Sequence, residues 1–233
     1  MSGMAPDSGE REGSYPLVLL QTHKGQTMSN IEPLRHFVQD MTRAVEQYGH
    51  DEPAMLRAGK ELLSRLIARD DWLPQEFALD QADTYRQYLL YCDPLERFSV
   101  VSFVWGPGHT TPVHDHTVWG LVGVLRGAEK CEEYERAGDG EPMRKTGEHI
   151  IEPGGIDAVS PTVGDIHTVS NALADRASVS IHVYGANIGA VQRHVYARET
   201  GAVKAFVSGY SNSVIPNLWG GSAQARSGAA ASG

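Results

Sequence analysis

The sequence feature that most constrains the fold is the pair His114 and His116, followed about fifty residues later by His167. Successive side chains of a β-strand point to opposite faces, so a His-x-His pair on a strand places both imidazoles on one face. A histidine from another strand would complete a triad around one ion. The pattern therefore predicts a metal site carried by β-strands.

The donor set limits the metal and its role. Three neutral imidazoles suit zinc, copper, iron or nickel, whereas a structural zinc site normally has a fourth ligand, often cysteine. Neither Cys92 nor Cys131 belongs to the histidine motifs. Three protein ligands leave positions open for water, substrate or O2, as a catalytic metal requires. The alternative is that these are packed or surface histidines, since ten histidines in the chain can produce the spacing by chance.

The residues around the histidines resemble the two motifs of the cupin superfamily, whose inner strands supply metal ligands in a small β-barrel. The first motif is matched by Gly108, His114, His116 and Gly127, and the second by Gly155, Pro161, Gly164, His167 and Asn171. Two positions depart from that pattern. The glutamate that many cupins carry after the histidine pair is absent, and two residues rather than one separate Pro161 from Gly164.

The missing glutamate indicates one branch of that superfamily, because an all-histidine triad is typical of the thiol dioxygenases, the cysteine dioxygenase family. Residues 105–109 resemble the family's approach to the histidine pair, and the match extends over about residues 85–193. The resemblance implies that His114, His116 and His167 bind Fe(2+). It also implies that both atoms of O2 are added to the sulfur of a small thiol, giving a sulfinic acid.

A further part of the resemblance is formed by Ser180, His182 and Tyr184, which alternate with apolar residues. From the pattern alone, an edge strand with one polar face in water is the favoured interpretation. In the family, these groups form a relay that points into the metal pocket and controls a proton. No cysteine lies between His116 and Gly127, so we expect Tyr184 to lack the thioether crosslink of the mammalian enzymes.

The resemblance also implies three substrate-binding residues, Tyr85, Gln87 and Arg193. Cysteine dioxygenases proper carry an arginine where this chain has Gln87, and bacterial members with glutamine resemble 3-mercaptopropionate dioxygenases. A neutral amide cannot replace the two-pronged contact of a guanidinium with a carboxylate. A shift by one residue would place Arg86 there, although on a strand Arg86 faces away from Tyr85. Arg193 either supplies the missing positive charge or is a surface arginine.

These features predict an iron(II) thiol dioxygenase that acts on a thiol carrying a carboxylate, with 3-mercaptopropionate favoured. A cysteine dioxygenase, which converts L-cysteine to cysteine sulfinate, is the alternative. Trp119 and Leu121 are candidates for the apolar wall of the pocket, with plain core packing as the alternative. Two other functions stay open: a cupin isomerase or hydrolase that uses zinc or manganese, and a non-catalytic cupin that binds a small molecule or acts as a sensor.

Periodicity divides the chain into a helical part and a β part. Apolar residues recur at helical spacing after Ser29, a candidate N-cap, and after Pro53, which predicts a helical cap over residues 29–81. Short runs with strand periodicity and Gly, Pro and Asp turns follow. The predicted strands are residues 85–91, 98–105, 117–125, 128–134, 149–152, 156–159, 166–171 and 178–184. The predicted fold class is mainly β, a cupin (small jelly-roll) β-barrel over residues 82–215 with N-terminal helices.

The amino-acid composition indicates what the two ends of the chain form and which classes of partner the protein binds. Residues 1–28 and 216–233 are expected to be disordered because they bury too little apolar surface, and residues 17–20 are too short an apolar run for a signal peptide or membrane span. A formal net charge of −9 disfavours nucleic acid and anionic membranes. We therefore expect a cytoplasmic protein whose partners are a small thiol and O2, with a homodimer favoured over a monomer.

Overall fold

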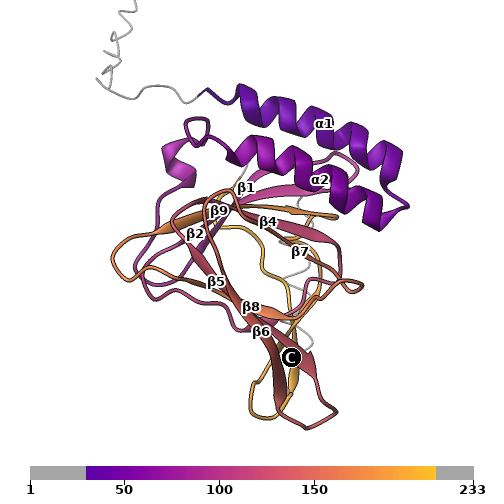
Figure 1. Ribbon diagram of the computed structural model, residues 1–233, viewed down its shortest axis with the longest axis vertical. Coiled ribbons are helices and arrows are strands. Elements are labelled where there is room, and N and C mark those ends of the chain that lie inside the picture. The colour runs from indigo at the N-terminus through magenta and orange to yellow at the C-terminus, as the bar shows by residue number, and fades with distance from the viewer. Residues whose placement is uncertain (1–29, 214–233) are drawn as a thin grey trace, which may run out of the picture.

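In the computed structural model, which describes residues 30–213, two helices lie on one face of a two-layered β structure (Figure 1). Helix α1 spans Glu32–Tyr48 and helix α2 spans Glu52–Ile67, each with a proline in its first two positions. Proline suits the first helical turn because its φ angle is preset there. Asp51 caps α2 by accepting a hydrogen bond from the N–H of Ala54 at 3.0 Å. The predicted cap Ser29 and the predicted disordered ends lie outside the described residues.

The strands form two antiparallel sheets. The first has the order β1-β2-β9-β4-β7, with strands Arg86–Cys92, Ser99–Trp105, Ser178–Tyr184, Gly120–Arg126 and Ile156–Val159. The second has the order β11-β10-β3-β8-β5-β6, with strands Val203–Phe206, Arg193–Tyr196, Val113–His114, His167–Asn171, Glu129–Arg136 and Met143–Ile151. A short 3-10 helix, Gln75–Phe77, lies between α2 and β1. The predicted mainly β jelly roll with N-terminal helices is confirmed, and its two sheets keep separate hydrogen-bonded ladders.

The two largest clusters of buried apolar residues hold the layers together. The outer core lies between the helices and the first sheet, where Leu63 and Ile67 of α2 are buried. A Cβ atom on Gly59 would lie 2.8 Å from the Leu121 side chain, so the missing side chain lets α2 approach β4 closely. The inner core lies between the sheets and includes Val101 and Val169. The helices therefore cover the outer face of the first sheet, while its inner face is left for the site (Figure 1).

The eight predicted strands correspond to β1, β2 and β4–β9, and the bounds of β7 and β9 agree with the prediction. The predicted strand ranges do not include β3, β10 and β11, which are two to four residues long. These strands are defined by distant pairing, such as that of Val195 in β10 with His114 in β3. Neither of the two described helices has the length and apolar character that crossing a membrane requires.

Candidate metal centre

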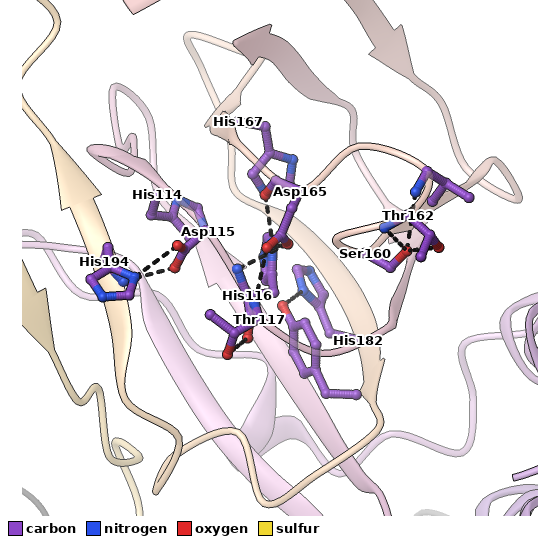
Figure 2. Close-up of polar contacts among 12 residues, drawn as sticks. His114, Asp115, His116, Thr117, Ser160, Thr162, Asp165, His167, His182 and His194 are labelled. Carbon is purple, nitrogen blue, oxygen red and sulfur yellow. Dashed lines mark hydrogen bonds and ion pairs between the residues drawn. The ribbon is translucent and has the colours of Figure 1, made fainter. Parts of the chain in front are cut away.

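Three histidines converge between the two sheets (Figure 2). His114 ends β3 and is paired directly with His167, which begins β8. His116 follows β3 after one residue. The ring centroids of each pair are 4.9 Å apart, and one nitrogen of each ring lies within 4.8 Å of the others. The predicted triad is therefore formed, although β3 ends at His114 and His116 lies just beyond the end of the strand.

The Nδ1 atom of each ring has a neighbour that fixes the orientation of the ring. These neighbours are the carbonyl oxygen of Pro112 at 3.0 Å from His114, a carboxylate oxygen of Asp165 at 3.0 Å from His116, and the sulfur of Cys131 at 3.5 Å from His167. The Nε2 atoms are therefore the ones left to bind an ion. Burial, and then the neighbouring histidines, lower the pKa of His114 and His167 well below the ordinary value. Both rings are neutral, which is the form that binds a metal.

Asp165 also fixes the backbone that carries His116. Its carboxylate accepts hydrogen bonds from the N–H groups of His116 at 2.9 Å and Thr117 at 3.0 Å. Thr117 has a φ angle of 60°, in the left-handed region that a β-branched residue rarely adopts. Burial alone would raise the pKa of Asp165, but its hydrogen bonds with His116 and Thr117 hold that pKa below the ordinary value. An ionised Asp165 thus stabilises the strained turn that directs His116.

Ser180, His182 and Tyr184 lie on β9 and form a hydrogen-bonded chain. The Ser180 hydroxyl is 2.8 Å from Nε2 of His182, and Nδ1 of His182 is 2.8 Å from the Tyr184 hydroxyl. Strand β9 is the central strand of its sheet and is buried throughout, so the edge-strand interpretation is wrong. Burial, and then His116, lower the pKa of His182, and burial raises the pKa of Tyr184. Both groups are therefore neutral near pH 7.

A cavity of about 240 Å³ adjoins the triad, and the three predicted substrate-binding residues Tyr85, Gln87 and Arg193 line it together with His182 and Tyr184. Its apolar wall consists of Phe103, Trp105, Val169, Val195 and Phe206. Trp119 and Leu121 are not among the lining residues, so the alternative of plain core packing is the one observed. Both belong to the outer core beneath the helices, because the inward and outward faces of β4 alternate.

The register of β1 decides between Gln87 and Arg86. Gln87 lines the cavity and donates from its amide nitrogen to the carbonyl oxygen of Gly209 at 2.7 Å. Arg86 faces the other way and donates to the Asp83 carboxylate at 2.7 Å. The expected orientation of these two neighbours is therefore present.

Arg193 brings a positive charge into the cavity and is only 5% exposed. It donates to the Ser208 hydroxyl at 2.6 Å and lies over the Phe206 ring at 4.7 Å, while its Nε has no partner among residues 30–213. Lys204 also lines the cavity, and none of the described lining residues is acidic. Burial lowers the pKa of Arg193. A buried guanidinium without a carboxylate partner is costly unless an anion binds beside it, so the surface interpretation of Arg193 is wrong.

A comparison with known protein families shows which family the chain belongs to. A family model described as cysteine dioxygenase type I matches residues 71–197, which is more than half of the chain. The chain belongs to the cysteine dioxygenase type I family. The matched range includes the histidine triad, the Ser180–His182–Tyr184 chain and all three cavity residues predicted to bind substrate.

Several solved structures resemble this cysteine dioxygenase family member at low identity. A protein from Thermus thermophilus is 18% identical, with 48% of this chain and 92% of that chain covered and a TM-score of 0.38. A cupin superfamily protein from Desulfitobacterium hafniense is 10% identical, with 47% and 84% covered and a TM-score of 0.36. A cupin family protein with a double-stranded β-helix fold from Methanocaldococcus jannaschii is 14% identical, with 46% and 85% covered and a TM-score of 0.34. The family assignment rests on the family model and not on these structures.

One supporting residue in this cysteine dioxygenase family member, Asp115, lies between the first two histidines of the triad. Its buried carboxylate accepts hydrogen bonds from the backbone N–H of His194 at 2.7 Å and from Nδ1 of His194 at 2.9 Å (Figure 2). It also accepts one from the Tyr196 hydroxyl at 2.7 Å. His194 and Tyr196 belong to β10, which also carries Arg193. Asp115 therefore ties the strand that carries the cationic residue to the metal motif.

Sequence reasoning identifies neither the supporting nor the additional lining residues. Asp115 lies between two predicted ligands, and Asp165 lies two residues before His167. This proximity is the only sign of their role in the sequence. Cys131 and Lys204 carry no such signal, because strand pairing alone brings β5 and β11 to the site. These residues determine how the triad is held and how the cavity is charged.

Proposed function

We propose that this protein is an iron(II)-dependent thiol dioxygenase that converts a small thiol carboxylate to the corresponding sulfinic acid. 3-Mercaptopropionate is the favoured substrate. The observation that carries the proposal is a small cavity in which neutral histidines adjoin a buried guanidinium that has no acidic partner among the described residues. Iron(II) held by His114, His116 and His167 would supply the redox chemistry through which O2 reacts with the thiol sulfur. Family membership supports the same reaction class.

The charge in the cavity supports a substrate with a carboxylate. A carboxylate can accept hydrogen bonds from the Arg193 guanidinium, whose Nε–H is unused within the described part of the chain. Gln87 lines the same cavity, but its amide nitrogen already donates to the backbone, so it adds at most one neutral donor. Arg193 therefore carries the binding of the carboxylate, and Lys204 increases the positive potential.

The same distribution of charge favours 3-mercaptopropionate over L-cysteine. The α-ammonium group of cysteine would need an anionic or strongly accepting partner once it leaves water. The cavity contains Arg193 and Lys204 and no acidic side chain among its described lining. Cysteine would therefore place a third positive charge beside those of Arg193 and Lys204, whereas 3-mercaptopropionate contributes only its carboxylate and thiol.

The Ser180–His182–Tyr184 chain can hold the proton of the Tyr184 phenol in a fixed position. Trp105 donates to the Ser180 hydroxyl at 3.2 Å, which in turn can donate to Nε2 of the neutral His182 ring. Nδ1–H of His182 then donates to the Tyr184 oxygen, so the phenolic proton is directed into the cavity. A phenol in this position can donate to the substrate carboxylate or to O2 during the reaction.

The test is O2 uptake by the iron(II)-loaded protein with 3-mercaptopropionate and with L-cysteine, compared through kcat/KM. We expect thiol-dependent uptake with both and a preference of about tenfold or more for 3-mercaptopropionate, because an unpaired ammonium costs at least ~1.4 kcal/mol. A preference for cysteine would overturn the substrate assignment and keep the reaction class. Absence of uptake with either thiol would favour the zinc or manganese isomerase, the hydrolase or the non-catalytic cupin.

A further inference from the structure

A second group of metal-binding side chains lies behind His167, on the side of its Nδ1 atom. The sulfur of Cys131, a ring nitrogen of His149 and a carboxylate oxygen of Asp157 lie within 4.8 Å of one another. Cys131 also lies 3.5 Å from Nδ1 of His167. Neither His149 nor Asp157 has a part in the thiol chemistry proposed above.

Three strands from both sheets build this group. Cys131 of β5 and His149 of β6 are direct cross-strand partners, so their side chains lie on the same face of the second sheet. Asp157 comes from β7 at the edge of the first sheet and reaches His149, with 2.6 Å between Oδ2 and Nε2. The group therefore joins the two sheets where their edges meet.

The surroundings of the group give an ion room to approach. A cavity of about 370 Å³ is lined by Cys131, His149 and Asp157, and by His167 from the far side of the triad. Cys131 is buried and Asp157 is half-buried, whereas the His149 side chain is 40% exposed. The sulfur is therefore protected from bulk water, and the nitrogen and oxygen donors face the entrance.

One sulfur, one imidazole and one carboxylate form a donor set for a particular class of ion. Zinc binds all three donor types, and a zinc site with three protein ligands takes water in the fourth position. Magnesium and calcium prefer oxygen donors only. We propose that Cys131, His149 and Asp157 form a second metal site, separate from the histidine triad, for a first-row divalent transition ion such as Zn²⁺. Without the ion, the His149–Asp157 contact is a hydrogen bond in which a proton occupies the place of the metal.

Cobalt(II) titration of the metal-free full chain tests this site without thiol, O2 or iron, so the result does not depend on the proposed dioxygenase activity. We expect two equivalents to bind and a sulfur-to-cobalt charge-transfer band to appear in the near ultraviolet. The histidine triad has no sulfur ligand and cannot give that band. The chain has only two cysteines, so Cys92→Ser is the matched control for Cys131→Ser.

Single substitutions test whether the sulfur-to-cobalt band comes from the group of Cys131, His149 and Asp157. Cys131→Ser should abolish it, Cys92→Ser should keep it, and His114→Ala should lower the stoichiometry to one while keeping the band. If Cys131→Ser does not fold, the two positions nearer to solvent carry the test. His149→Gln and Asp157→Asn should each weaken, at least tenfold, the cobalt binding that produces the band. His36→Ala, at an exposed position on α1, should leave it unchanged.

Three results would overturn the proposal: no band in the wild-type protein, a band that Cys131→Ser leaves intact, or unchanged affinity in both His149→Gln and Asp157→Asn. Any of these would leave His149 and Asp157 as a simple hydrogen-bonded pair between the sheets.

Discussion

The Asp165 carboxylate accepts a hydrogen bond from Nδ1 of His116 at 3.0 Å and another from the backbone N–H of the same residue at 2.9 Å. One side chain therefore fixes both the ring and the backbone of a metal ligand. Such supporting contacts determine which ring nitrogen is free and where it points.

We expect Asp165→Asn to weaken iron(II) binding about 10–100-fold, because the amide loses the charge that orients His116 and stabilises the turn at Thr117. Equilibrium metal titration of the purified variant measures the loss. Asp175→Asn, which changes an exposed carboxylate beside Arg176, is the control. Equal affinity of the two variants for iron would contradict the supporting role of Asp165.

Arg193→Met should lower kcat/KM for 3-mercaptopropionate about 30-fold, since a hydrogen bond to a charged group contributes about 2 kcal/mol. The same variant should react with 2-mercaptoethanol, which lacks a carboxylate, as well as the wild type does. Arg86→Met removes an arginine that faces away from the cavity and should change neither value. A parallel loss with both thiols would show that Arg193 acts on the fold rather than on the carboxylate.

Removal of the Tyr184 hydroxyl should affect turnover and leave metal binding unchanged. A positioned proton donor typically contributes 10²–10⁴-fold, so we expect Tyr184→Phe to lower kcat by about 10²-fold or more. The phenyl ring keeps its place beside His116 and against Gly120, where a Cβ atom would lie 2.7 Å from the ring. Tyr134→Phe, whose hydroxyl bonds Glu132 outside the cavity, is the control. An unchanged kcat in Tyr184→Phe would exclude the phenol from the reaction.

Glu129 makes the stability of the protein depend on pH. It is 0% exposed, one of its oxygens has no partner among the described residues, and burial raises the pKa of its carboxyl to about 8. The folded state therefore holds a proton that the unfolded chain loses near pH 4.5. The contribution of the protonated Glu129 carboxyl to the free energy of unfolding is fully present below that pH. It is lost as the pH rises toward about 8, by at most ~1.4 kcal/mol per pH unit.

Urea unfolding at several values between pH 5 and pH 8 measures this dependence. Glu129→Gln, which cannot ionise, should have a free energy of unfolding with a shallower slope against pH than the wild type. Glu61→Gln, at an exposed position on α2, should keep the wild-type slope. If Glu129→Gln and the wild type have the same slope, Glu129 is ionised in the folded protein throughout this range.

The sequence predicts the elements whose residues interact locally, and fails where distant pairing decides the structure. Strands β7 and β9 have clear periodicity and are predicted with their observed bounds. Strand β10 is missed because its residues, Arg193–Tyr196, lack that periodicity and are ordered by pairing with β3 and β11. Its position is also what brings Arg193 into the cavity, which the sequence alone leaves open.

The histidine triad is predicted because its spacing and its motifs are unusual in a sequence. The residues that orient the triad are not predicted. A single cysteine such as Cys131 gives no sign in the sequence that β5 will place it beside His167 of β8. The orientation of Trp119 and Leu121 is left open by the sequence for a related reason. Which face of a strand is inward depends on what covers the other face, and here the helices cover it.

Mass spectrometry of the product formed under ¹⁸O₂ tests the central claim most directly. The iron(II)-loaded protein should convert 3-mercaptopropionate to a sulfinic acid that carries two ¹⁸O atoms, and His167→Ala should form none. A product with one ¹⁸O atom, or a disulfide without ¹⁸O, would contradict the assignment of this cavity to a thiol dioxygenase.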